Sequence, residues 1–332
     1  MTNESDSLKG HDVLITGGLG FIGSNLAHRC LALGARVTVY DCLDANSGGN
    51  LYNIRDIRDD VEVAFHDILS FDFLAQYAAG KTIIFNCAAS TSHPFSMREP
   101  WIDMDVNSRG VINLLEVVRR FNRDAMIVHV GTSTQLGRLH YQPADENHPE
   151  YPQDIYSANK SVSEKYVLIY AHAHGLQATV IRLANVYGPR AAIHSPEFTF
   201  NNYFIGLALQ GKPVTVYGDG DQKRNVTYVD DVVTALIKAA QTDNTIGKAL
   251  FAVGDEHYSI AEIAQATVRN MGTGEVSFID WPASRGAVEI GDAVFSNAAI
   301  TSVLNWSAED TLTTGLQKTK AFYADKLEHY LG

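Results

Sequence analysis

The chain has 332 residues, of which 45% are hydrophobic and 19% charged, a composition typical of a globular protein with a sizeable core. Its formal net charge is −12 without a basic stretch, which argues against nucleic acid or an anionic membrane as a partner. The first nine residues are polar and no apolar run is long enough to cross a bilayer, so we expect no signal peptide, no membrane span and a cytoplasmic location.

The first predicted strand, Asp12–Thr16, runs into a glycine-rich turn that opens a helix over Phe21–Leu33. The glycines are spaced as Gly17, Gly20 and Gly23. A pyrophosphate needs close approach of the backbone, so the positions that face it cannot carry a side chain. The N–H groups and the dipole at the start of the helix then favour the phosphates. This strand–turn–helix context predicts a dinucleotide-binding site.

The second predicted strand, Arg36–Tyr40, ends at Asp41. A carboxylate there suits hydrogen bonds to a ribose 2′-hydroxyl, which favours NAD over NADP as the cofactor. The alternative explanation of Asp41 is a purely structural acid in a turn at the end of a strand.

Strand and helix patterns then alternate with short connections, as βαβ units require. Most of the strands are continuous apolar runs, which favours an α/β fold with a Rossmann-type, doubly wound parallel sheet covered on both faces. The further predicted strands are Val61–Phe65, Thr82–Asn86, Met126–Val130 and Ala178–Leu183, and the further helices are Asp103–Phe121 and Asp154–His174.

After Leu183, proline, glycine and aromatic residues become more frequent and the elements shorter. We expect an NAD-binding domain over residues 1–184 and a smaller C-terminal α/β substrate-binding lobe over residues 185–332. Some segments of the second part are expected to return to the first domain, where a later strand is a candidate to complete the sheet. The elements expected in the smaller lobe include Pro213–Tyr217, Val226–Val229, Ala249–Val253 and the helix Ser259–Asn270.

The cysteines and histidines give no sign of a metal site. The three cysteines, Cys30, Cys42 and Cys87, lack metal-type spacing, and we expect buried thiols in a reducing compartment. His172 and His174 are two apart on a predicted helix, so they point to different faces and make a poor metal pair. We predict no metal.

Tyr156 and Lys160 are four apart on a predicted helix, so they share one face. A nearby ammonium favours the phenolate of a tyrosine, which makes proton exchange with a sugar hydroxyl feasible. Thr132 stands at the end of a predicted strand and offers a hydroxyl that can share the substrate hydrogen bond. Ordinary turn chemistry is the alternative explanation of Thr132 and the hydroxyl residues after it.

Together these residues resemble the extended short-chain dehydrogenase/reductases, specifically the NAD-dependent sugar-nucleotide epimerase/dehydratase family. The resemblance runs from about His11 to Ala240 and is weaker beyond. Its motifs are TGGLGFIG (16–23), YDCLD (40–44), HDI (66–68), NCAAS (86–90), GTSTQLG (131–137), YSANK (156–160), RLANVYGPR (182–190) and YGDGDQKRNVTYVDD (217–231).

The resemblance implies a role for each matching residue. Thr132, Tyr156 and Lys160 would be catalytic, and Lys160 would also hold the nicotinamide ribose. The residues implied to bind the cofactor are Gly17, Gly20, Phe21, Ile22 and Gly23 at the pyrophosphate, Asp41 at the ribose, Asp67 and Ile68 at the adenine, Ala88 and Ala89 at the nicotinamide, and Tyr156 and Lys160. The residues implied to bind a nucleotide-diphosphate sugar are Ser92, Ser96, Ser133, Asn185, Arg224 and Arg285, with His93 and the loop Ala191–Glu197 nearby. Arginine suits this role because its planar fork pairs two phosphate oxygens.

The residues after Thr132 bear on the reaction. Dehydratases of the family carry Asp-Glu there, and decarboxylating relatives carry a glutamate at the second position. This chain has Ser133 and Thr134, neither of which can act as an acid near neutral pH. We therefore expect an epimerase that retains NAD, with transient oxidation to a keto-sugar, rotation and hydride return.

Departures from the common galactose-type epimerases place the chain near epimerases of CDP- or GDP-linked deoxysugars, so the epimerised carbon (C2 or C4), sugar and base stay open. Those departures lie in Gln135–Gly137, in the loop Asp44–Asn50 and in residues 91–100. The alternatives are a nucleotide-sugar 4-ketoreductase or dehydratase of the same family and, from another class, a non-catalytic dinucleotide-sensing protein. The helices Asp103–Phe121 and Asp154–His174 also resemble those that form the family's dimer interface, which implies a homodimer.

Overall fold

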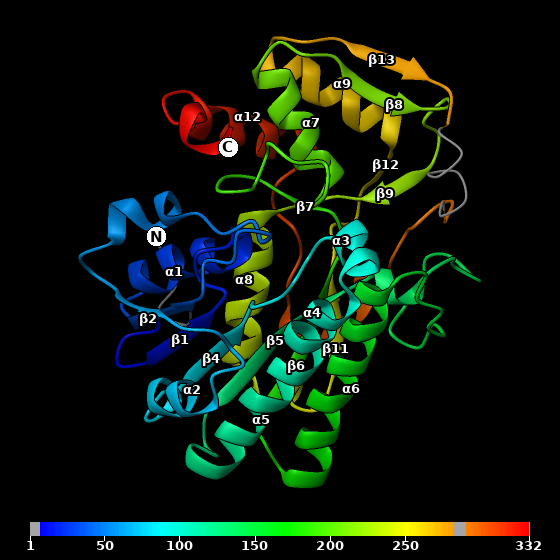
Figure 1. Cartoon of the computed structure of the whole chain (residues 1–332). Helices are drawn as coiled ribbons and strands as arrows, with labels where there is room; N and C mark the ends of the chain where they lie inside the picture. The colour runs from blue at the N-terminus through cyan, green and yellow to red at the C-terminus, as the bar shows by residue number, and fades with distance from the viewer. Residues whose placement is uncertain (1–6, 282–289, 332) are drawn as a thin grey trace. The chain divides into compact units, whose positions relative to one another are not determined.

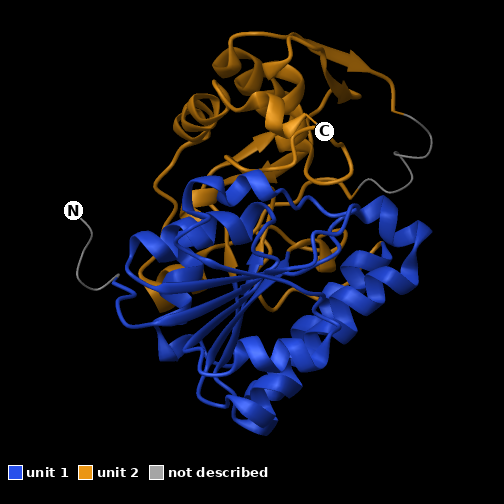
Figure 2. Cartoon of the chain, turned by 60° about the vertical axis from the view of Figure 1, so that its left-hand side comes forward, with its two compact units in different colours: residues 1–132, 154–182, 233–250 blue, residues 133–153, 183–232, 251–332 orange. Residues whose placement is uncertain are grey.

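The computed structural model describes residues 7–281 and 290–331 and divides into two compact units. Unit 1 contains residues 1–132, 154–182 and 233–250, and unit 2 contains residues 133–153, 183–232 and 251–332 (Figure 2). The domain boundary expected at residue 184 remains a prediction.

Unit 1 is built on a seven-stranded sheet with the order β11-β6-β5-β4-β1-β2-β3 (Figure 1). The pairs β1–β2, β1–β4, β2–β3 and β4–β5 are all parallel. The strands are β1 (Asp12–Thr16), β2 (Arg36–Asp41), β3 (Glu62–Phe65), β4 (Ile83–Asn86), β5 (Met126–Thr132), β6 (Ala178–Leu183) and β11 (Ala249–Ala252). The predicted α/β fold is confirmed, and β11 is a later strand that completes the sheet, as we considered from the sequence. We expected its own segment, Ala249–Val253, among the elements of the smaller lobe, so that assignment is corrected.

The order of the strands reverses beside β1, since β2 lies on one side of it and β4 on the other. Ligands of such sheets bind at this reversal, outside the carboxyl ends of the strands. The glycine turn that follows β1 and the alanines that follow β4 therefore lie where a ligand is expected.

Helices pack against the sheet. Successive residues of a strand face opposite sides of the sheet, so neighbouring residues belong to different layers of the core. Leu14 of β1 belongs to a core cluster with α2, α5 and α6, whereas the buried neighbours Val13 and Ile15 face the other side. Helix α1 packs against β1 and β2. The helices of unit 1 are α1 (Phe21–Ala32), α2 (Phe71–Ala78), α3 (His93–Arg98), α4 (Pro100–Met104), α5 (Gly110–Phe121) and α6 (Ile155–His174), with a 3-10 helix at Leu51–Ile57.

The residues that flank α6 set its limits, whereas a second predicted helix differs from the structure. Helix α6 begins after Asp154, whose side chain accepts a hydrogen bond from the amide of Ser157, and ends at Gly175 in the left-handed conformation. The predicted helix Asp103–Phe121 instead begins at Pro100 and contains a π-helical turn over Asp105–Arg109 between α4 and α5. Such single π-turns are frequent at functional sites.

In the described part of unit 2, the strands form three two-stranded sheets, namely β10–β7, β12–β9 and β13–β8. Its α9 begins with a capping box in which Ser259 and Glu262 satisfy each other's backbone amides. The elements are β7 (Val186–Tyr187), α7 (Phe200–Leu209), β8 (Val214–Tyr217), β9 (Lys223–Asn225), β10 (Thr227–Tyr228), β12 (His257–Ser259), α9 (Ile260–Met271), β13 (Val276–Ile279), α11 (Ala298–Leu304) and α12 (Leu312–Tyr323), while α8 (Val229–Ala240) crosses from unit 2 into unit 1.

The cysteines differ in exposure. Cys30 is buried in α1, as expected. Cys42 is exposed because it lies in the loop after β2, which corrects the expectation that all three thiols are buried.

Candidate active site

The glycine turn after β1 leaves no space for side chains. Gly17 has a φ of +67°, and a Cβ atom there would lie 2.6 Å from the amide nitrogen of Ala88. A Cβ atom on Gly23 would lie 2.3 Å from the carbonyl oxygen of Gly17. No side chain caps the start of α1, which follows at Phe21 and Ile22. The turn therefore has the bare backbone and the helix start that a pyrophosphate requires.

Asp41 holds this turn in place. Its carboxylate accepts hydrogen bonds from the amides of Leu19 at 2.9 Å and Leu43 at 2.7 Å. Burial raises the pKa of Asp41, and these two hydrogen bonds oppose the rise. Because a carboxylate has about four acceptor positions, two such bonds leave capacity for a ribose hydroxyl. The structural and the ligand-binding explanation of Asp41 are thus compatible.

The residues expected near the adenine and the nicotinamide follow strands β3 and β4. Asp67 accepts a hydrogen bond from the amide of Leu69 at 2.8 Å, which shapes the turn after β3. Ile68 is buried and packs beside Gly110 of α5. Ala88 and Ala89 follow β4 after one intervening residue, and the amide of Ala88 lies beside the glycine turn. Their contacts with a cofactor remain predictions.

The three residues that we predict to be catalytic all belong to unit 1. Thr132 is the last residue of β5 and forms a side-chain hydrogen bond with Tyr156 in the first turn of α6. Burial raises the pKa of Tyr156, with smaller contributions from Asp103 and Asp154, and the bond to Thr132 opposes the rise. Burial also lowers the pKa of Lys160 to about 8. Burial therefore disfavours the phenolate form of Tyr156.

Helix α3 supports Tyr156 from the side. Ser96 accepts a hydrogen bond from the backbone amide of Tyr156 at 3.1 Å, and its hydroxyl donates a hydrogen bond to the carbonyl of His93. Ser92 caps α3 by accepting from the amide of Phe95 at 3.0 Å. Both serines are buried, so the structure gives them supporting positions, and their contact with a sugar remains a prediction.

Sequence reasoning missed a histidine–carboxylate pair beside Tyr156. His93 Nδ1 lies 2.6 Å from Asp154 Oδ2, and the ring of His93 meets the ring of Tyr156 edge-on at 4.7 Å between centroids. The hydrogen bond to His93 lowers the pKa of Asp154, against the effect of burial. The only sequence signal was the position of His93 in a segment expected near the sugar.

The residues of unit 2 expected to bind the substrate are held by backbone groups. Asn185 donates to the carbonyl of Asn225 at 3.0 Å, and Arg224 donates to the carbonyl of Gly291 at 2.6 Å. Ser133 is buried, and its amide donates to Leu183. Arg285 lies outside the described residues.

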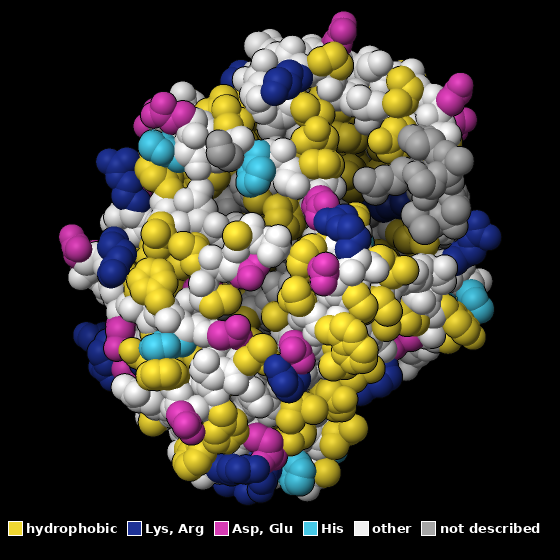
Figure 3. All heavy atoms as spheres, in the orientation of Figure 1, with side chains coloured by type: hydrophobic (Ala, Val, Ile, Leu, Met, Phe, Trp, Pro, Cys, Tyr) yellow, Lys and Arg dark blue, Asp and Glu magenta, His cyan; other side chains and the backbone are white. Residues whose placement is uncertain are grey.

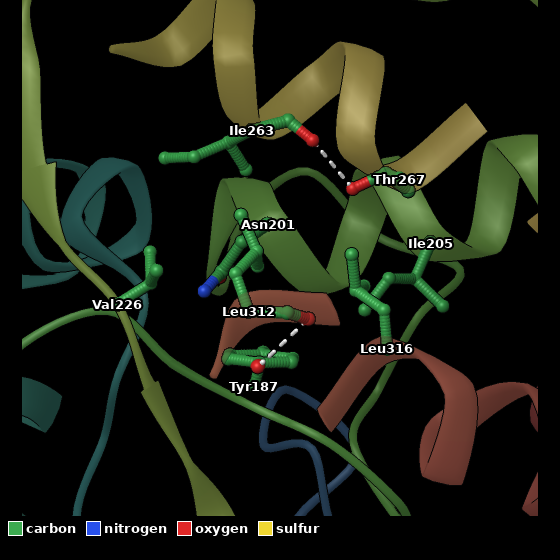
Figure 4. A pocket seen from close by; sticks show the side chains of 8 residues that line it. All are labelled: Tyr187, Asn201, Ile205, Val226, Ile263, Thr267, Leu312 and Leu316. Atoms are coloured by element: carbon green, nitrogen blue, oxygen red, sulfur yellow. Dashed lines mark hydrogen bonds between the residues drawn. The ribbon is translucent and has the colours of Figure 1, made fainter. Parts of the chain in front are cut away.

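A small pocket in unit 2 lies close to Asn185. Asn201 lines this pocket, and its side chain donates to the carbonyl of Asn185 at 2.9 Å. Tyr187 lies on another side of it and donates to the carbonyl of Leu312 (Figure 4). The pocket is too narrow to admit a water molecule, so it is part of the packing of unit 2 and no ligand site.

Within residues 7–281 and 290–331, no group of three or more His, Cys, Asp or Glu side chains is arranged to hold a metal ion. Among the helices described, none has the length and apolar character that a membrane span needs.

Comparison with known proteins agrees with this arrangement. Residues 13–261 match the model of the NAD dependent epimerase/dehydratase family. The chain is 30% identical over 320 residues to a UDP-glucose 4-epimerase of Mycolicibacterium smegmatis. The aligned region covers 94% of this chain and 98% of the relative.

Two solved structures resemble the whole chain. A UDP-glucose 4-epimerase from Thermotoga maritima, solved with UDP-glucose, has a TM-score of 0.85 at 25% identity and covers 95% of this chain and 99% of that one. The Thermus thermophilus UDP-glucose 4-epimerase, solved with NAD, has a TM-score of 0.83 at 26% identity with the same coverage. The glycine turn fits the cofactor that the family model specifies. This chain therefore belongs to the NAD-dependent epimerase/dehydratase family, which acts on sugar nucleotides and whose cofactor is NAD.

Proposed function

We propose that this protein is a sugar-nucleotide epimerase that retains its NAD and works through a transient keto-sugar. The observation that carries the proposal is the hydrogen bond between Thr132 and Tyr156, with Lys160 one helical turn away on α6. These groups lie beside the edge of the sheet at which the glycine turn and Ala88 meet. A sensor protein would not need a hydroxyl-paired tyrosine at that edge.

In the proposed reaction, Tyr156 takes the proton of a sugar hydroxyl, and Thr132 shares the hydrogen bond to the same oxygen. NAD, held at the glycine turn and Asp41, would supply the acceptor for the sugar's hydride and the source of the hydride for the keto-sugar. Because burial disfavours the phenolate of Tyr156, the nearby positive charges must compensate when substrate is bound. Lys160 supplies one of these charges while it is protonated.

Ser133 and Thr134, which follow Thr132, favour epimerisation over dehydration. Loss of water needs an acid and a base placed next to the catalytic hydroxyl, and serine and threonine hydroxyls do not ionise near neutral pH. An NADPH-fed reductase is disfavoured by Asp41, whose carboxylate would repel a 2′-phosphate. Return of the hydride to the same sugar is the outcome that needs no further ionisable group.

We propose a nucleotide-diphosphate sugar as the substrate, as in the relatives with UDP-glucose, bound by Asn185, Arg224 and Arg285. An arginine fork matches the diphosphate. The cytoplasmic location and the exclusion of nucleic acid remain predictions from the sequence.

The experiment that tests the function uses the purified protein without added cofactor. Bound nucleotide is released and identified, and UDP-, GDP-, CDP- and dTDP-sugars are followed by NMR in deuterated water. We expect one sugar to interconvert with its epimer. Consumption of NADH or NADPH with a keto-sugar, without any interconversion, would replace this proposal with a reductase, and deuterium next to the keto carbon would point to enolisation.

We also propose that the protein forms a homodimer through α4–α6. Figure 3 shows hydrophobic side chains gathered over the part of the surface that α4, α5 and α6 form. Trp101 is 75% exposed on α4, and Ile169 is 53% exposed on α6. Val162 lies on the same face of α6 as Ile169, two helical turns away. Aromatic and aliphatic side chains that are left exposed together are typical of interaction sites.

Light scattering coupled to gel filtration tests the dimer. We expect Trp101→Glu combined with Ile169→Glu to convert a dimer into a monomer. A wild-type protein that is already monomeric at micromolar concentration would exclude this interface.

A further inference from the structure

A series of buried polar side chains, joined by hydrogen bonds, connects Lys160 with strands of the sheet. Thr16 of β1 donates to Asn86 Oδ1 at 2.6 Å, Asn86 Nδ2 lies 3.0 Å from His129 Nδ1, and His129 Nε2 lies 3.3 Å from Lys160 Nζ. The four side chains come from β1, β4, β5 and α6 and are at most 4% exposed. Neither Asn86 nor His129 is among the site residues predicted from the sequence.

The direction of the hydrogen bonds follows from which atoms can donate. Since Thr16 donates to the amide oxygen of Asn86, the amide nitrogen must donate to Nδ1 of His129. A neutral imidazole then carries its single proton on Nε2, which faces Lys160. An ammonium group on Lys160 would meet this N–H as a second donor, so this direction requires an uncharged Lys160 whose amine accepts a hydrogen bond from the N–H. The amine can still donate to the carbonyl of Val130, 2.7 Å away.

The opposite direction fits the same heavy-atom positions. An amide oxygen and nitrogen have almost the same shape, so Asn86 can present its oxygen to His129 and its nitrogen to Thr16. His129 then carries its proton on Nδ1, and its Nε2 accepts a hydrogen bond from a charged Lys160. The direction of all these hydrogen bonds therefore reverses when Lys160 loses or gains one proton.

The surroundings make Lys160 the group that changes charge. Burial, and then the charge of Lys160, lower the pKa of His129 well below its ordinary value, so His129 stays neutral in both directions. Burial lowers the pKa of Lys160 to about 8, and the acidic groups that face it, Cys87 of the loop after β4, Glu164 of α6 and Asp103 of α4, oppose this fall.

We propose that Thr16, Asn86 and His129 form a reversible hydrogen-bond wire that positions Lys160, and that His129 takes the tautomer that the protonation state of Lys160 demands. His129 is a positioning residue, because it acts on the substrate only through Lys160. Ser163 supports it from α6, since its oxygen lies 3.4 Å from His129 Nε2 while its hydroxyl donates to the carbonyl of Lys160 at 2.9 Å. The effect on catalysis rests on the proposed role of Lys160 in epimerisation, whereas the wire itself does not.

Nitrogen-15 NMR of histidine-labelled protein tests the wire without any substrate. The signals of His129 are assigned by their loss in His129→Gln. We expect the proton of His129 to move from Nδ1 to Nε2 as the pH rises past the pKa of Lys160, which burial lowers to about 8. In Lys160→Met the tautomer should no longer depend on pH, and in Ser163→Ala, which leaves the wire intact, the change should persist. A tautomer that is constant in the wild type, or that still changes in Lys160→Met, would overturn the proposal.

Activity gives a second, separate measurement. We expect His129→Leu to lower kcat about 10- to 100-fold with little change in KM, as loss of an orienting partner does. The step in the pH profile of kcat that reports the titration of Lys160 should also shift by about one pH unit. His129→Gln, whose amide both donates and accepts, should recover part of the rate. Wild-type kcat and pH profile in His129→Leu would contradict the positioning role, and a protein that shows the tautomer change but turns over no sugar would refute the epimerase and leave the wire standing.

Discussion

The two units present their candidate ligand-binding groups in different forms. In unit 1, the turn after β1 presents bare backbone, and Gly17 and Gly23 cannot take even a methyl group because Ala88 and the turn itself occupy the space. In unit 2, Asn185 and Arg224 are side chains held in place by hydrogen bonds to backbone carbonyls. A backbone site depends on the fold around it, whereas a side-chain site can lose one group while its surroundings remain.

This difference predicts opposite effects of substitution. Changes in the glycine turn should alter folding and cofactor binding together. Changes at Arg224 should alter substrate binding alone. Four variants, from the largest expected effect to the smallest, test whether the contrast holds.

The largest effect is expected for Gly17→Ala. The new Cβ would lie 2.6 Å from the amide nitrogen of Ala88, and the φ of +67° adds strain for any other residue. We expect the free energy of unfolding to fall by about 3 kcal/mol or more and bound NAD to be lost, as measured by denaturation and nucleotide release.

Gly80 offers a matched control for Gly17. Its φ is +71°, but a Cβ atom there would have no atom within 4 Å. Gly80→Ala should therefore show only the backbone strain, about 1–2 kcal/mol, and should keep NAD. Equal effects of the two substitutions would mean that strain, and not the close approach of Ala88, decides the cost.

The second variant, Tyr156→Phe, separates chemistry from architecture within unit 1. Removal of one hydroxyl leaves the amide of Tyr156 bonded to Ser96, so α6 should keep its position. We expect kcat to fall about 10²- to 10⁴-fold with NAD still bound. Tyr170→Phe on the same helix, which loses only a bond to Glu116, is the control and should stay active. Full activity of Tyr156→Phe would refute the proposed mechanism.

Arg224→Met tests the side-chain site of unit 2. A charge-assisted bond to a diphosphate contributes about 1.5–3 kcal/mol, so KM should rise roughly 10- to 100-fold while stability and NAD content change little. Its neighbour Lys223 gives the control, because Lys223→Met removes an adjacent charge that we do not expect to touch the substrate. If both variants raise KM equally, the general positive charge matters and Arg224 has no specific contact.

The sequence predicted unit 1 well because its strands are continuous apolar runs with local turn signals. Strands β1 and β6 match the predicted limits Asp12–Thr16 and Ala178–Leu183. The sequence suggested that a later strand completes the sheet but did not identify β11 as that strand, since a parallel sheet pairs segments that are far apart in the chain and carry no mark of their neighbours. The smaller elements of unit 2, such as the two-residue β7, are too short for any periodicity to show.

Sequence reasoning identified the candidate site better than its supporting contacts. The glycine turn and the pair Tyr156 and Lys160 have fixed spacings within one segment, so the sequence alone reveals them. The contact of His129 with Lys160 depends on β5 packing against α6, and that of His93 with Asp154 on α3 meeting the start of α6. Such contacts follow from tertiary packing and leave no periodic signal in either segment.

The smallest effect is expected at Asp41, which combines both forms of site. Its carboxylate is a side chain, yet two of its bonds go to amides of the turn, Leu19 and Leu43. Asp41→Asn keeps an acceptor for one of these amides and removes the charge that would repel a 2′-phosphate. We expect the preference for NAD over NADP to fall about tenfold, measured by competitive binding to protein stripped of nucleotide, with at most about 1 kcal/mol lost in stability. If stability falls sharply while the preference stays unchanged, Asp41 serves only the turn, and the ribose must be recognised by the backbone of unit 1 as well.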